Sequence, residues 1–302
     1  MRGPLSAVTA ALVLACGSNG GIADDSGAPD VATTSDGASG DGGTPSEAST
    51  SDGGGDAGAA CKRGVATNDA PGAAFAPAVA WWYDWSLQGG ASPLDFVPMY
   101  WGTSTTGDPL PAGAHAVLGF NEPNFKAQSN LTPTQAAAAW PTIEAKAKSA
   151  GIPIVSPAVN FCGSSTDPSG CSDTTITDPY TWLKDFFAAC SGCEVDAIAV
   201  HWYNCDLPSL KGYIDGNGSL EGFVQFGKPI WLTEFSCDGS HSEADQETYM
   251  KAAVPYLEGN PNVARYAWFS ASPIPNAVLA NGDGSLTPLG QLYESLAASC
   301  SP

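Results

Sequence analysis

Two glutamates could form a catalytic pair, because each directly follows an apolar run typical of a buried β-strand. Glu122 comes after Val117-Leu118-Gly119-Phe120, with one asparagine between, and Glu234 comes after Ile230-Trp231-Leu232-Thr233. Either glutamate alone could be an ordinary surface carboxylate, but the pair is more specific. Hydrolysis of a glycosidic bond needs two carboxyl groups, one that protonates the leaving oxygen and one that attacks the anomeric carbon. Nothing in this layout requires a metal or a cofactor.

Eight short β-rich runs would position these residues within the second part of the chain. They are Arg63–Asn68, Val79–Trp85, Phe96–Trp101, Ala116–Phe120, Pro153–Val159, Ala197–Tyr203, Pro229–Glu234 and Arg265–Ser270. Several are continuously apolar, as expected of parallel strands that are buried on both faces. Alternation of strand and helix over eight repeats favours an α/β fold, a single (β/α)8 TIM barrel, whose active site lies at the C-terminal ends of its strands. A doubly wound sheet is disfavoured, since no convincing glycine-rich phosphate loop follows a strand.

Four helix starts are visible between these strands. Thr132-Pro133-Thr134-Gln135 has the capping-box pattern, and Gly151 would end that helix. Asp178-Pro179 opens a second helix, Ser242 with Asp245 a third, and Thr287-Pro288 the last.

The motifs at the strand ends resemble those of clan A glycoside hydrolases, and within the clan those of family 128. That family is the glycosyl hydrolase catalytic core group related to fungal alkali-sensitive linkage proteins. The resemblance covers essentially all of residues 61–302. It is carried by segments that occur in the family's order: Phe96-Val97-Pro98-Met99-Tyr100-Trp101-Gly102, Leu118-Gly119-Phe120-Asn121-Glu122-Pro123-Asn124, Val155-Ser156-Pro157-Ala158, Asp196-Ala197-Ile198-Ala199-Val200-His201-Trp202-Tyr203, Trp231-Leu232-Thr233-Glu234-Phe235 and Arg265-Tyr266-Ala267-Trp268-Phe269.

This resemblance implies endo-acting cleavage of β-1,3-glucan with retention of configuration. Glu122 matches the family's acid/base and Glu234 its nucleophile. Asn121 matches the clan's asparagine that hydrogen-bonds the sugar 2-hydroxyl, a bond that strengthens in the transition state. His201 and Tyr203 share a face of their strand and are expected to orient the nucleophile, although a buried pair satisfied by the backbone would look the same.

Aromatic residues near the strand ends are candidates for stacking on sugar rings, because an indole covers the apolar face of a sugar at little entropic cost. Trp101 and Trp268 are the first candidates, followed by Tyr83 and Trp85. If Trp101 points into the barrel mouth, Tyr100 should point outward. Asn68, after the first strand, would also line the site.

The N-terminal 60 residues differ sharply in composition from the rest. Residues 1–15 read as a lipoprotein signal peptide, and Val13-Leu14-Ala15-Cys16 resembles a lipobox with Cys16 as the lipidated residue. An ordinary signal peptide with an incidental cysteine is the alternative. Residues 16–60 are rich in Gly, Ser and Asp, lack aromatic residues, and are expected to be a disordered tether. We therefore expect an exported protein, anchored in a membrane through its N-terminal lipid or secreted.

Eight further cysteines lie in the expected barrel, and an even number behind an export signal predicts disulfides. The expected pairs are Cys61–Cys300, Cys162–Cys171, Cys190–Cys193 and Cys205–Cys237. Cys190 and Cys193 have the spacing of redox and zinc sites, but a second such motif is missing, and a local structural bridge is preferred.

The formal net charge of −20 argues against nucleic acid as a partner and suits a neutral polysaccharide, bound by a monomer. Two alternatives remain open. One is a clan A hydrolase acting on β-1,4-glucan, mannan or xylan, and the other is a non-catalytic carbohydrate-binding surface lipoprotein.

Overall fold

Eight short parallel β-strands form the centre of the molecule in the computed structural model, which describes residues 61–298. Each overlaps the run expected from the sequence. They are β1 (Arg63–Ala66), β2 (Trp81–Tyr83), β3 (Asp95–Phe96), β4 (Val117–Leu118), β5 (Ile154–Val155), β6 (Ile198–Trp202), β7 (Ile230–Phe235) and β8 (Val263–Phe269).

The strands pair in the order of a TIM barrel. Six form one parallel sheet in the order β3-β2-β1-β8-β7-β6, and β4 and β5 form a second sheet. Isolated parallel bridges connect the two sheets, Met99 to Leu118 at one junction and Val155 to Ala197 and Val159 to Val200 at the other. These two junctions are bridges and not ladders, since β3, β4 and β5 have only two residues each. The expected (β/α)8 order of strands is therefore confirmed.

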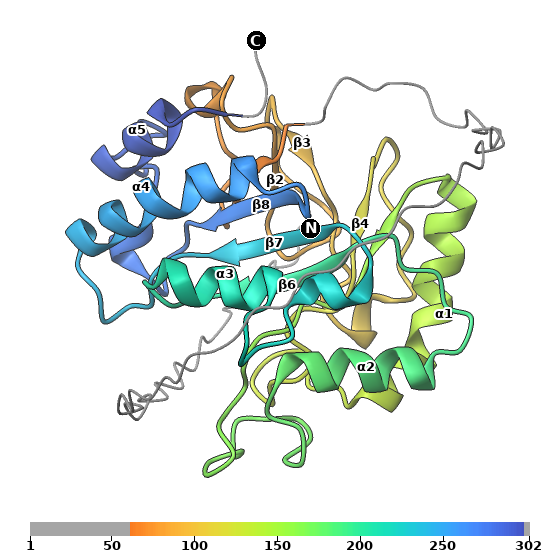
Figure 1. The fold of residues 1–302 in the computed structure, drawn as a ribbon. Helices are drawn as coiled ribbons and strands as arrows, with labels where there is room; N and C mark the ends of the chain where they lie inside the picture. Colours follow the sequence, from red (N-terminus) through yellow and green to blue (C-terminus); the bar gives the residue numbers. More distant parts are fainter. Residues whose placement is uncertain (1–60, 299–302) are drawn as a thin grey trace, which may run out of the picture.

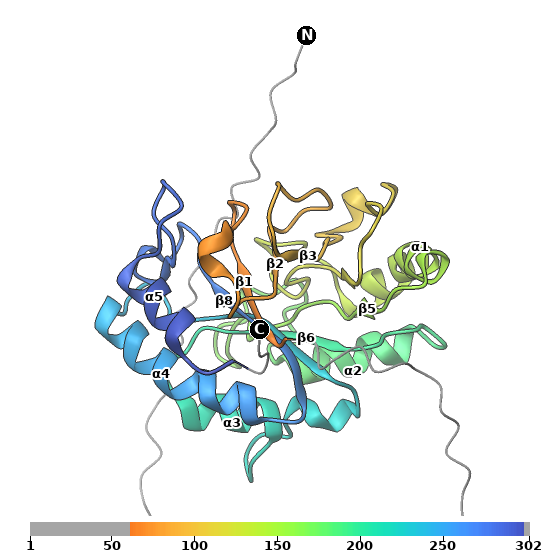
Figure 2. The same ribbon diagram turned by 90° about the horizontal axis from the view of Figure 1, so that it is seen from above.

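The helices lie around one side of the strands, whereas loops cover the other side (Figures 1 and 2). The α-helices follow β4 to β8: α1 (Pro133–Ala150), α2 (Pro179–Ala189), α3 (Leu207–Asp215), α4 (Glu243–Gly259) and α5 (Pro288–Ser295). Short 3-10 turns complete the structure: η1 (Ala73–Phe75), η2 (Thr103–Thr105), η3 (Phe223–Phe226) and η4 (Pro275–Ala277). The expected alternation of strand and helix over eight repeats is thus wrong for the first three repeats, because no α-helix among residues 61–298 directly follows β1, β2 or β3. The connections after β1, β2 and β3 all contain proline and glycine, which disfavour helix interiors.

The expected helix starts are present. Thr132 accepts a hydrogen bond from the backbone of Gln135, whose side chain accepts one from the backbone of Thr132, and Gly151 ends α1 in the left-handed conformation. Asp178, Ser242 and Thr287 likewise cap α2, α4 and α5. The cap of α3 is Asp206, and this helix was not anticipated.

Three of the expected disulfides are present: Cys162–Cys171 in the loop after β5, Cys190–Cys193 after α2, and Cys205–Cys237 between the loops after β6 and β7. The Cys61–Cys300 pair includes Cys300, which lies outside the described residues, as do the signal peptide, Cys16 and the tether. These remain predictions. Within residues 61–298, none of the helices is long and apolar enough to cross a membrane.

Candidate active site

The two glutamates meet at the C-terminal ends of β4 and β7. Glu122 is 3% exposed and Glu234 is 2% exposed. One oxygen of each, together with a ring nitrogen of His201, lies within 4.8 Å of the others. Residues 112 positions apart in the sequence are thereby brought into one buried cluster.

Local backbone irregularities aim both glutamates into this cluster. The register between β6 and β7 shifts after Val200, so that His201 lies opposite Glu234 and Thr233 has no partner across the ladder. Such a bulge redirects a side chain and is frequent beside active sites. Glu122 itself has φ +37°, in the left-handed region that non-glycine residues rarely adopt. Backbone strain of this kind is found mainly where a functional position is held by its surroundings.

Three hydrogen-bond donors from two other strand ends hold the Glu234 carboxylate. Its Oε1 accepts from the Tyr83 hydroxyl (2.9 Å) and from Trp85 Nε1 (2.7 Å), and its Oε2 accepts from the Tyr203 hydroxyl. Burial, reinforced by the charge of Glu234, holds the pKa of Tyr83 and that of Tyr203 well above 10, so both hydroxyls stay protonated donors. These donors fix the orientation of Glu234 and compensate its negative charge.

His201 lies between the two glutamates. Its Nδ1 is 3.0 Å from Glu122 Oε1 and 3.1 Å from Glu234 Oε2. Burial raises the pKa of Glu122, and the negative charge of Glu234 raises it further. His201 lowers the pKa of Glu122, but the net shift is upward. Burial alone would lower the pKa of His201, but the two carboxylates raise it. Glu122 therefore has the environment of a general acid, which must carry a proton before the reaction.

An aromatic wall surrounds Glu234, and one member was not anticipated. The Trp85 ring lies 5.4 Å from that of Tyr83 and 5.6 Å from that of Phe269, and Phe269 lies 5.4 Å from Tyr203. Trp85 adopts φ +62°, a second left-handed residue at the site. Phe269 ends β8, and alternation of side chains along the strand alone does not show whether Phe269 or Trp268 faces the site.

Trp268 cannot stack on a sugar, so this expectation was wrong. It is fully buried, its Nε1 donates to the carbonyl of Ala277, and its ring packs against Phe235 and Tyr293. Tyr293 belongs to α5, so Trp268 faces the helical layer and its neighbour Phe269 faces the site.

Trp101 lies five residues after the end of β3, is half-buried and retains exposed surface. Tyr100, one position earlier, points outward as expected, with the ammonium of Lys146 on α1 above its ring. Asn121 is 4% exposed and accepts no hydrogen bond at Oδ1 from the described residues, which leaves an acceptor available. Asn68 is exposed, and no hydrogen bond within residues 61–298 links its side chain to the glutamates.

Glu122, His201 and Glu234 are also the one group of metal-ligand residue types among residues 61–298. Both oxygens of Glu234, however, already accept hydrogen bonds from Tyr83, Trp85 and Tyr203. A metal ion would have to displace these donors. The donor set therefore suits a carboxylate that acts directly.

Two buried, neighbouring carboxyl groups at the mouth of a TIM barrel, one with an upward-shifted pKa, define a glycoside hydrolase. Residues 59–293 match the model of the family described as "Glycosyl hydrolase catalytic core", and the chain belongs to that family.

Known proteins of this family are similar over most of the barrel. Alkali-sensitive linkage protein 1 from Schizosaccharomyces pombe is 30% identical over 237 residues, which are 72% of this chain and 40% of that protein. This chain thus spans less than half the length of that relative. The crystal structure of a GH128 (subgroup II) endo-beta-1,3-glucanase from Sorangium cellulosum shares 40% identity at a TM-score of 0.66, covering 78% of this chain and 98% of that one. A GH128 (subgroup VII) oligosaccharide-binding protein from Cryptococcus neoformans shares 25% identity at a TM-score of 0.62, covering 78% and 93%.

Proposed function

We propose that this chain cleaves β-1,3-glucan internally and with retention of configuration. The spacing of the two carboxyl groups carries the proposal. Retaining enzymes hold their carboxyl groups about 5–5.5 Å apart, whereas inverting enzymes need about 6.5–9.5 Å to admit a water molecule. One oxygen of Glu122 and one of Glu234 lie within 4.8 Å of each other, and this proximity supports the shorter, retaining separation. The β-1,3-glucan linkage is inferred from the similar glucanase of Sorangium cellulosum.

In the first step, a Glu234 oxygen attacks the anomeric carbon while the bond to the leaving oxygen breaks. Glu122 donates its proton to that oxygen, and a covalent glycosyl ester on Glu234 results. In the second step, Glu122, now ionised, takes a proton from water. The resulting hydroxide attacks the anomeric carbon and releases Glu234. The negative charge shifts between Glu234 and Glu122 during the two steps. His201 contacts both carboxyl groups and compensates this charge on either one.

A non-catalytic binding protein is the second candidate, because one similar structure is described as oligosaccharide-binding. The site favours catalysis over binding alone. Binding of a sugar does not require a proton donor such as Glu122, whose pKa is raised by burial. Nor does binding require a second buried carboxylate, Glu234, that is oriented by three hydrogen-bond donors. Burying both carboxyl groups costs folding free energy that only the chemistry would justify.

The test is a panel of polysaccharides incubated with the full chain, with product sizes followed over time. We expect laminarin and curdlan to release oligosaccharides of several lengths at early times, as endo cleavage requires. Carboxymethylcellulose, mannan and xylan should release little. Preferred cleavage of one of these would contradict the β-1,3 assignment, and binding of laminarin without release of sugar would establish the binding protein instead.

A further inference from the structure

Trp85, which donates a hydrogen bond to the nucleophile, has a backbone conformation that tryptophan rarely adopts. Its φ of +62° lies in the left-handed region, which is unusual for a bulky side chain. Its indole Nε1 donates to Glu234 Oε1 (2.7 Å), and its ring packs against Tyr83 and Phe269. Such a conformation persists only where the surrounding structure enforces it. A residue that enforces it therefore acts on the nucleophile through Trp85.

The two neighbours of Trp85 close a turn around it. Asp84 Oδ1 accepts from the backbone N–H of Ser86 (3.2 Å) and from the Ser86 hydroxyl (2.8 Å). An aspartate that accepts from the residue two positions later forms an Asx turn, which mimics a backbone turn. The carbonyl of Ser86 accepts in addition from the backbone N–H of Met99 (2.8 Å), after β3. Because Asp84 directly follows β2, the turn is attached to the barrel at both of its ends.

The same turn occurs elsewhere in the chain with glycine in its middle. Asp283 Oδ1 accepts from the backbone N–H (3.0 Å) and from the hydroxyl (2.6 Å) of Ser285. The residue between them is Gly284, with φ +84°, a conformation that glycine adopts without steric cost. Trp85 takes the corresponding place in the first turn. Backbone strain is thus present in the turn whose middle residue supplies an N–H to Glu234.

We propose that Asp84 is a positioning residue for catalysis, which holds Trp85 in the left-handed conformation that directs its indole N–H at Glu234. This inference rests on the proposed function, which makes Glu234 the nucleophile. Asp84 acts through Trp85, because its side-chain hydrogen bonds within residues 61–298 do not include either glutamate of the site. Without the turn, the backbone at Trp85 would relax toward an unstrained φ, and the carboxylate would lose a donor.

The test is a double-mutant cycle in the full chain, followed by kcat/KM for laminarihexaose, which includes the attack by Glu234. We expect Asp84→Ala and Trp85→Phe each to lower kcat/KM roughly ten- to hundredfold, as the loss of a hydrogen bond to a charged group predicts. In the Trp85→Phe background, Asp84→Ala should lower it by less than about twofold more, since the donor that Asp84 positions is already absent. Asp84→Asn, whose side-chain oxygen can still accept from Ser86, should stay within about threefold of the wild type.

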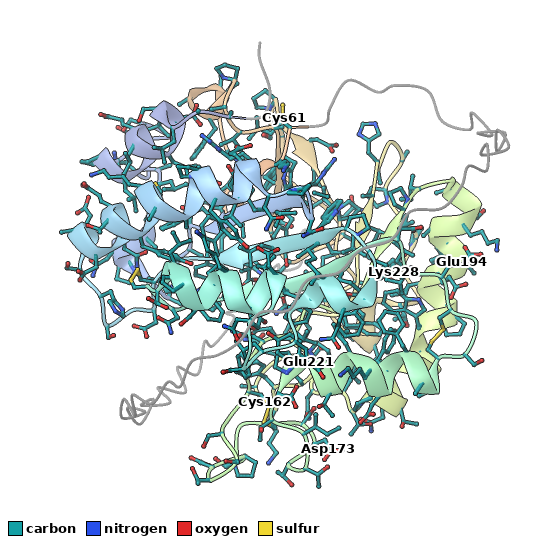
Figure 3. All side chains as sticks on the ribbon, in the orientation of Figure 1. Cys61, Cys162, Asp173, Glu194, Glu221 and Lys228 are labelled. Atoms are coloured by element: carbon teal, nitrogen blue, oxygen red, sulfur yellow. A yellow bond between two sulfur atoms is a disulfide. The ribbon has the colours of Figure 1, made fainter. Side chains whose placement is uncertain are left out.

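Two aspartates in turns of the same kind provide matched controls. Asp283→Ala opens the turn around Gly284. Asp173→Ala opens a turn with Thr175, in the loop that extends from the bottom of the molecule in Figure 3. Both variants should keep the wild-type kcat/KM, because Glu234 accepts its hydrogen bonds from other residues.

A full loss from Asp84→Ala in the Trp85→Phe background would overturn the proposal, because Asp84 would then act on the substrate or the fold by another route. Wild-type kcat/KM in the folded Asp84→Ala variant would overturn it as well. If Asp84→Ala unfolds below the assay temperature, Asp84→Glu replaces it, since glutamate keeps the charge but is too long to close the same turn. A wild-type chain that releases no sugar from laminarihexaose would instead overturn the proposed function.

Discussion

Replacement of Glu234 by alanine is expected to lower kcat on laminarin by about 10⁵-fold, because it removes the atom that bonds to the anomeric carbon. The donors Tyr83, Trp85 and Tyr203 would keep their places around an empty position. Release of reducing ends measures the loss, and circular dichroism checks that the variant is folded.

Azide provides the decisive control for this variant. A small anion that fills the space of the missing carboxylate can attack the anomeric carbon directly, so an α-glycosyl azide should form. Glu194→Ala, which removes an exposed carboxylate paired with Lys148, should keep wild-type activity. If Glu234→Ala retains more than about a hundredth of kcat, far above the residual activity expected without a nucleophile, Glu234 is not the nucleophile.

Replacement of Glu122 by alanine should have the second-largest effect, about 10²- to 10⁴-fold on laminarin. A sugar is a poor leaving group and needs the proton that Glu122 supplies. An aryl laminaribioside with an acidic phenol needs little protonation, so its first step should slow far less. If the Glu122→Ala variant lost the same factor in rate on both substrates, Glu122 would not be the general acid.

The pH dependence of kcat/KM follows from the upward shift of the Glu122 pKa, which burial causes. The enzyme is competent while Glu122 is protonated, so activity should be present below that pKa and fall as the pH rises through it. Because the pKa is raised, this fall should lie at higher pH than for an ordinary glutamate. Glu122→Ala should lose this alkaline limb on the aryl substrate.

The strand ends could be predicted because buried parallel strands appear in the sequence as apolar runs that end at polar residues. Glu122 and Glu234 both follow such runs, and the structure brings them together. The loops after the first three strands could not be predicted as helix or turn from the strand pattern alone. The prolines and glycines in these three loops disfavour a helix, although the eightfold repeat predicts one.

The choice between Trp268 and Phe269 shows where the sequence was insufficient. Which of two neighbouring residues points into the barrel depends on register, and the pairing of β7 with β8 is irregular between Leu232 and Phe235. The contact of Trp85 with Glu234 depends on the left-handed backbone conformation of Trp85, which the sequence pattern does not predict. Tyr203, in contrast, contacts Glu234 as its position two residues after His201 suggested. Tyr83, expected to stack on a sugar, is instead fully buried and donates its hydroxyl to Glu234.

The configuration of the first product tests the central claim most directly. Proton NMR of laminarihexaose hydrolysis, recorded within the first minutes, distinguishes the two anomers before they equilibrate by mutarotation. Double displacement by Glu234 and Glu122 predicts that the new reducing end appears first as the β-anomer. Initial release of the α-anomer would mean a single displacement by water, and the roles assigned to both glutamates would be wrong.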